Sequence, residues 1–222
     1  MDAKFRAFRD LILDLWRDFG TLLDDSPERA RQVLQLAQSR FSPCKLEVLE
    51  DILRRSAEGR ASLDDMRQLV YLKPVRKDGA VTAPAFSLTC DFTHQLPEVR
   101  LRVALFRVHD VEGEHVLRAI AYRYEAPEAR TKEEQSSSKH GYYHAQPSLR
   151  ICNQALPTMP WMPTEHPAFP LDAQCPVSLV FAMLVSLYGA KRAIERMSRD
   201  PGGVWRGALK NTHWWGVYSR RE

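Results

Sequence analysis

Apolar residues recur every three or four positions over the first 23 residues of the chain, with charged residues between them. This spacing predicts an amphipathic helix over residues 3–23. Serine–proline pairs at 26–27 and 42–43 precede two further apolar faces and predict two more helices, because serine caps a helix well and proline fits its first turn. A short fourth helix or turn is predicted to begin at Ser62. Residues 1–68 are therefore predicted to form a helical subdomain.

Near residue 70 the apolar spacing changes to every second residue, which predicts strands with one buried face. Four segments alternate in this way: 85–92, 99–108, 116–125 and 142–151. Before them, residues 69–75 are predicted to form a strand that Pro74 ends or confines to an edge of the sheet. Residues 77–84 are predicted to form a turn and loop. Turn residues separate the first three strands, which favours an antiparallel meander. A polar loop is expected over residues 126–141.

The C-terminal part begins with a segment, 152–174, whose five prolines exclude regular structure. After it, residues 176–188 are apolar on nearly every side, which predicts a buried helix over 175–199. The fold is predicted to be α+β, because the strands do not alternate with helices. Residues 69–222 are expected to form a four- to five-stranded antiparallel sheet, with this C-terminal helix packed on one face and a tail rich in tryptophan and arginine.

The composition is that of an ordinary globular protein, with 44% hydrophobic residues, 27% charged residues and a net charge of +4. This mild positive charge permits nucleic acid as a partner without requiring it. The four cysteines lie far apart and form no C-x-x-C pair, which disfavours a zinc or redox site and a disulfide scaffold. Reduced thiols and the absence of a signal peptide or membrane-spanning run predict a cytoplasmic protein without a membrane partner.

The segment KHGYYHAQPSLR, residues 139–150, holds the strongest catalytic candidates. In a strand His144 and Gln146 share the polar face, and pairing with the preceding strand brings Glu125 within reach. His144, Glu125 and His140 are therefore candidates for general acid–base catalysis or metal binding, since histidine transfers protons near neutral pH. The competing interpretation is a solvated histidine on the wet face of a strand. No metal or cofactor motif is found, so no cofactor is predicted.

Two further surfaces are candidates for binding nucleic acid or a protein partner. The polar sheet face offers arginines, with Tyr122, Tyr124 or Tyr142 for base stacking: Arg100, Arg102, Arg123 and Arg150. The tail interleaves aromatic and basic residues of the kinds that are enriched at interfaces: Trp205, Arg206, Lys210, Trp214, Trp215 and Arg220. Each surface also has a structural interpretation, a solvated face for the first and a cover for the core for the second.

Two functions follow from these residues. The first is a non-catalytic intracellular interaction module, an accessory subunit of a complex that handles nucleic acid. The second is a small hydrolase, for instance a nuclease, centred on Glu125, His140 and His144. A protein partner is expected and nucleic acid is a second candidate partner, while the oligomeric state is not predicted. A cleft in which Glu125 and His144 converge favours the hydrolase, and an open face favours the module.

Overall fold

The structure is a computed structural model of the chain. It describes residues 3–21, 23, 26–77, 80–127, 131–137, 142–157, 169–171, 173, 175–197, 207 and 210. Within these residues it contains six helices and one large mixed sheet, which confirms the predicted α+β class.

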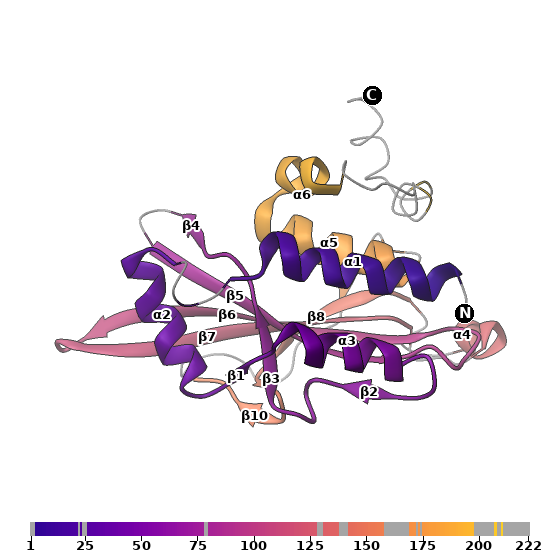
Figure 1. Ribbon diagram of the computed structural model, residues 1–222, viewed down its shortest axis with the longest axis horizontal. Helices are drawn as coiled ribbons and strands as arrows, with labels where there is room; N and C mark the ends of the chain where they lie inside the picture. The colour runs from indigo at the N-terminus through magenta and orange to yellow at the C-terminus, as the bar shows by residue number, and fades with distance from the viewer. Residues whose placement is uncertain are drawn as a thin grey trace.

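Four strands form the centre of the sheet: β5 (Ala80–Asp91), β6 (Glu98–Val111), β7 (Glu114–Glu125) and β8 (His144–Ser148). They pair antiparallel in this order, with Phe86 opposite Val103 and Glu125 opposite His144. The β6–β7 connection is a two-residue turn in which Glu112 and Gly113 both have positive φ, at 53° and 86°. Such a turn matches the twist of a hairpin, so β6 and β7 continue as a long two-stranded ribbon (Figure 1).

The sheet is larger than predicted, because it has nine strands and is mixed instead of holding four or five antiparallel ones. The remaining strands of the sheet are β1 (Ser42–Pro43), β2 (Ala61–Ser62), β3 (Gln68–Tyr71), β4 (Val75–Lys77) and β11 (Phe169–Pro170). The β1–β3 pair is parallel and makes the sheet mixed. Strands of two to four residues are too short to show alternation in the sequence. A separate hairpin joins β9 (Arg150–Ile151) to β10 (Gln154–Ala155).

Several local predictions are wrong where long-range pairing overrides the local signal. Residues 42–43 were expected to begin a helix, but they form β1, and α3 spans Leu46–Arg55. Residues 80–84 were expected in a loop, but they belong to β5. Pro84 joins the ladder through its carbonyl oxygen, which accepts a hydrogen bond from Leu72 N at 2.8 Å and so needs no N–H from proline. The polar loop predicted over 126–141 contains a short helix, α4 (Lys132–Ser137).

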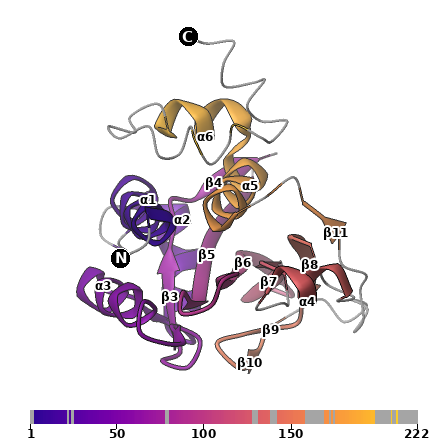
Figure 2. The ribbon, with the colours of Figure 1, turned by 90° about the vertical axis from the view of Figure 1, so that its right-hand side faces the viewer.

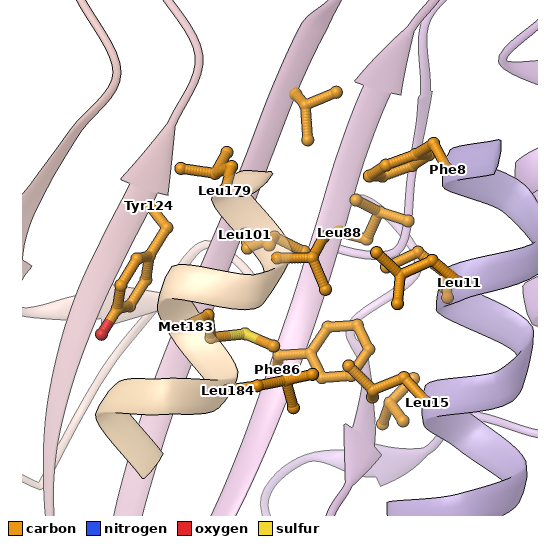
Figure 3. Close-up of a cluster of buried hydrophobic side chains, with 14 of the residues drawn as sticks. Phe8, Leu11, Leu15, Phe86, Leu88, Leu101, Tyr124, Leu179, Met183 and Leu184 are labelled. Carbon is orange, nitrogen blue, oxygen red and sulfur yellow. The ribbon is translucent and has the colours of Figure 1, made fainter. Parts of the chain in front are cut away.

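One face of the sheet packs against two helices, α1 (Ala3–Phe19) and α5 (Pro176–Tyr188). Figure 3 shows Leu11 and Leu15 of α1 and Met183 and Leu184 of α5 directed toward Phe86 of β5. All five side chains are buried. The expected burial of the apolar helix after residue 175 against the sheet is therefore confirmed, and α1 shares the same core.

The opposite face carries small residues along the central strands: Ala83, Ala85, Ala104, Ala119 and Ala121, all of them buried. Small side chains let a covering element approach the sheet closely. The helix α2 (Glu28–Gln38) and Ile151 of the β9–β10 hairpin pack onto them. Both faces of the sheet are thus covered, and β5 is buried at nearly every position.

The predicted helix over 175–199 is divided in two by Gly189. This glycine ends α5 with φ 80° and ψ 155°, a conformation open mainly to glycine, and α6 (Ala190–Met197) follows it. Figure 2 shows α6 stacked outside α5, on the side away from the sheet. The expectation of a solvated second half is wrong in part, because Ala193 and Ile194 of α6 are buried in the same core, while Lys191 and Arg192 are exposed.

Replacing Gly189 by alanine should lower the free energy of unfolding by about 1–3 kcal/mol, because an L side chain is strained in this conformation. The matched control is Gly59→Ala, since Gly59 lies outside the left-handed region and an added Cβ meets nothing within 4 Å. Urea unfolding of both variants measures the difference. Equal stability of the two variants would show that the break between α5 and α6 does not depend on glycine.

Candidate functional site

Polar side chains form two rows across the sheet, on the face opposite α1 and α5. The first row joins neighbours in strand register: Ser62, Thr89, Arg100, Glu125 and His144. The second row lies two residues away along each central strand: Ser87, Arg102, Arg123 and Gln146. Residues two apart on a strand share a face, so each row follows from the alternation of its strands. We refer to Arg100, Arg102, Arg123 and Gln146 as the arginine face.

Glu125 is buried at the centre of the first row. Its Oε2 lies 3.3 Å from His144 Nε2. Its Oε1 pairs with Arg100 and lies 3.7 Å from Arg123 Nη1. The amide of Gln146 lies between Glu125 and Arg123: in one orientation its nitrogen donates to Oε2 at 3.3 Å, and in the turned orientation its oxygen accepts from Arg123 Nε at 3.1 Å. The carboxylate of Glu125 therefore lies at the centre of four polar side chains: Arg100, Arg123, His144 and Gln146.

His144 has no exposed surface, so the expectation of a histidine on a wet face is wrong. Its Nδ1 lies 3.0 Å from the carbonyl oxygen of Tyr142, and its Nε2 faces Glu125. A neutral imidazole carries one N–H, whereas a protonated imidazole carries two. Because both nitrogens face acceptors, the arrangement favours the protonated ring. A buried His–Glu ion pair then joins β8 to β7.

Two opposing influences act on the pKa of Glu125. Burial raises it, but the hydrogen bond with His144 and the charges of Arg100 and Arg123 outweigh burial and lower the pKa to about 2. The carboxylate therefore stays ionised at neutral pH, and its low basicity makes it a weak proton acceptor. Its geometry suits an anchor for cations better than a general base.

A second buried carboxylate, Asp64, lies in the turn after β2 and pairs with Arg102 of the second row. Its Oδ2 lies 2.7 Å from Arg102 Nη1, and its Oδ1 accepts a hydrogen bond from the backbone N–H of Cys152 at 2.9 Å. Cys152 and Asn153 form the β9–β10 turn with positive φ, at 51° and 59°. Asp64 thus ties this turn to the arginine face. No local pattern points to Asp64, because it and the neighbouring Asp65 are locally equivalent in the segment SLDDM.

The arginine face holds like charges at close range. Arg102 lies directly opposite Arg123 in the β6–β7 register, an arrangement that destabilises a sheet when nothing compensates for it. The three guanidinium groups are balanced by two carboxylates, Glu125 and Asp64. One positive charge is left over, or two when His144 is protonated. The arginine side chains remain partly exposed, at 27% for Arg100, 16% for Arg102 and 31% for Arg123.

The structure does not bring all predicted site residues together. Arg150 is exposed in the separate β9–β10 hairpin, where it pairs with Ala155. Lys210 is exposed. The remaining candidates lie outside the described residues: His140, Trp205, Arg206, Trp214, Trp215 and Arg220. Their proposed roles stay predictions.

Only one of the three tyrosines considered for stacking lies near the arginine face. Tyr124 is buried on the opposite face, against α5, where it cannot reach a base (Figure 3). Tyr122 shares that face by alternation and packs against the same core. Tyr142 is 40% exposed, and its ring lies 5.6 Å from that of His144, edge to face. Tyr142 is therefore the aromatic side chain available beside the site.

Comparisons with known proteins give this chain no relative. No protein-family model, no curated protein and no solved structure matches it. Within the described residues, no cluster of three histidine, cysteine or acidic side chains is placed to hold a metal ion. None of the described helices is both long and apolar enough to cross a membrane. All four cysteines are free thiols.

Proposed function

We propose that this protein is a non-catalytic module that binds single-stranded nucleic acid on the arginine face, as an accessory subunit of an intracellular complex. The observation that supports the proposal is the set of three guanidinium groups held side by side by two buried carboxylates. Each guanidinium has one end fixed in an ion pair and keeps part of its surface in solvent. Such groups are pre-organised for phosphate, because arginine offers planar, bidentate donors.

The neighbours of the arginines add to this interpretation. Gln146 brings an amide, which both donates and accepts and so suits the edges of bases. Tyr142 brings an exposed ring next to the site, on which a base can stack. Phosphate contacts, stacking and a few polar contacts are the usual combination in modules that bind single strands. A duplex keeps its bases stacked inside, so it offers nothing to Tyr142.

A hydrolase centred on Glu125 and His144 is the second candidate, and their 3.3 Å separation favours it. Two observations favour the binding module instead. His144 is fully buried, so a substrate reaches it only if the site opens. Glu125, with its pKa lowered to about 2, is a poor general base at neutral pH.

The protein partner and the intracellular location belong to the same proposal. The free thiols, three of which are buried, fit a reducing compartment. The partner surface is proposed in the tail, on Trp205, Trp214 and Trp215, three residues that lie outside the described part of the chain. A pull-down with the full chain and a chain shortened after residue 197 tests this surface: the partner should be retained by the full chain alone.

Replacing Arg123 by glutamine should weaken binding of a labelled 12-nucleotide single strand by about tenfold at low salt, since one phosphate contact is lost. The plot of log affinity against log salt concentration should also become shallower, by about 0.7. The matched control is Arg118→Gln, which removes the same charge from the opposite face of the same strand β7. Fluorescence anisotropy measures both variants.

Equal weakening by the two variants would contradict the proposal, because it would mean that binding follows net charge alone. Absence of binding by the wild-type protein to DNA and RNA strands would also contradict it. The same reactions, analysed on a denaturing gel, test the hydrolase. If the wild-type protein cleaves the strand and the His144→Asn variant does not, the hydrolase replaces the binding module as the proposed function.

A further inference from the structure

A separate cavity of ≈ 840 Å³ lies where the end of α1, the start of α2 and the β3–β4 link meet. None of its lining residues belongs to the arginine face. In Figure 1, α2 and β4 lie at the end of the sheet opposite to β8, which carries His144. The volume is within the range of about 300–1,000 Å³ that is usual for sites of small molecules. The cavity is therefore large enough for a ligand of its own.

The charged residues that line this cavity are mostly basic. Among the described lining residues, Arg17, Arg29, Lys73 and Arg76 contribute four cations and Glu28 contributes one carboxylate. Arg17 also pairs with Asp14 at 3.3 Å. Arg29 and Arg76 are exposed and form no ion pair with any residue that the structure describes. The four cations come from α1, α2 and the β3–β4 region, so the fold gathers them from distant parts of the sequence.

Lys73 is held in place without losing its charge. Its Nζ donates to the carbonyl oxygen of Asp18 at 2.8 Å, which positions the ammonium group but leaves two of its three N–H groups for other acceptors. In addition, α2 begins beside the cavity at Pro27 without a side-chain cap. The positive end of the helix dipole thus adds to the positive potential of the side chains. Both features favour an anion with several oxygen atoms.

Beside the hydroxyl groups of Thr21 and Ser26, the lining also contains apolar side chains, which shape the ligand further. Pro27, Pro74, Val75 and Val81 give the cavity a wall that contacts uncharged atoms. Free phosphate fills only a small part of ≈ 840 Å³ and leaves this wall unused. A ligand with an anionic end and a flat, largely apolar body uses both parts of the cavity. We infer that the cavity binds the phosphate end of a nucleoside phosphate, with the nucleoside against the apolar wall.

The inference is tested with isothermal titration of the full chain with ADP, inorganic phosphate and adenosine. ADP should bind, and both phosphate and adenosine should bind at least about tenfold more weakly, because each uses one part of the cavity. The double variant Arg29→Gln/Arg76→Gln should weaken ADP binding by about thirtyfold, from the loss of two charge-assisted contacts. Equal affinity for ADP and inorganic phosphate would overturn the nucleoside class.

The matched control is Arg54→Gln/Arg60→Gln, which removes the same charge from exposed positions that do not line the cavity. It should bind ADP like the wild-type protein. Undiminished ADP binding by the cavity variant, or no heat with any nucleotide, would overturn the inference. Circular dichroism and thermal unfolding establish that the cavity variant is folded, so a loss of binding reports on the cavity.

Two further measurements test the source of the phosphate and the independence of the cavity from the arginine face. A single-stranded oligonucleotide with a 5′-phosphate is compared with the same oligonucleotide with a 5′-hydroxyl, to tell whether the cavity takes a free nucleotide or the end of a nucleic-acid strand. Competition with ADP by the phosphorylated oligonucleotide alone indicates the end of a strand. Arg123→Gln should leave ADP binding unchanged. Loss of ADP binding in Arg123→Gln would overturn the assignment of the nucleotide to this cavity, whatever the fate of the arginine face.

Discussion

Replacing Asp64 by alanine should lower the free energy of unfolding by about 3 kcal/mol, because it removes one partner from a buried ion pair. Asp64 is buried, and it serves both Arg102 and the backbone N–H of Cys152. The variant leaves a guanidinium without its anion and an N–H without its acceptor. Since Arg102 keeps 16% of its surface exposed, water reaches part of the group, and the loss lies at the lower end for buried pairs.

The adjacent residue provides the control. Asp65 is 53% exposed and pairs with Arg60 at 2.9 Å, so Asp65→Ala should change stability by no more than about 0.5 kcal/mol. Asp64→Asn separates the two contacts, because asparagine still accepts from Cys152 but no longer neutralises Arg102. Urea unfolding at pH 7 measures all three variants. Similar losses in the two alanine variants would show that Asp64 does not hold the β9–β10 turn to the sheet.

The central strands were predictable because they are long and alternate between a mostly apolar face and a more polar one. Alternation over 99–108 and 116–125 located β6 and β7 and placed Arg100 and Arg102 on the same face. The short strands were not predictable, since two residues such as those of β1 carry no period. Their positions depend on partners far away in the chain, as in the pairing of Ser42 with Gln68.

The candidate site was predictable in its strand pairing but not in its register or its burial. Alternation of the two segments suggested that pairing brings Glu125 within reach of His144, and the register of β7 with β8 places the two residues directly opposite each other. The sequence also marked this face as polar, and a polar face is usually a wet one. In the fold, α2 and the β9–β10 hairpin cover other parts of the same face, and His144 is buried beside its partners. Such covering follows from tertiary contacts, which no local pattern contains.

Stability should depend on Glu125 most clearly in acid. Its pKa is about 2 in the folded protein against 4.5 for the unperturbed group, so the unfolded chain binds this proton more readily. The stabilisation is then fully present above about pH 4.5 and is lost as the pH falls toward 2. A difference of this size corresponds to about 3 kcal/mol. Burial alone raises the pKa, so the hydrogen bond with His144 and the charges of Arg100 and Arg123 account for its net lowering.

Replacing Glu125 by glutamine should therefore lower the free energy of unfolding at pH 7 by about 3–5 kcal/mol and remove most of this pH dependence. The loss arises because Arg100, Arg123 and His144 remain in place around a neutral amide. Urea unfolding from pH 7 to pH 2.5 measures it, with Glu114→Gln, at the exposed end of the same strand, as the control. The contradicting result is a parallel fall in the stabilities of the wild-type protein and Glu125→Gln between pH 4.5 and pH 2.5. The pH dependence would then come from other carboxylates, and Glu125 would not be the ionised centre of the site.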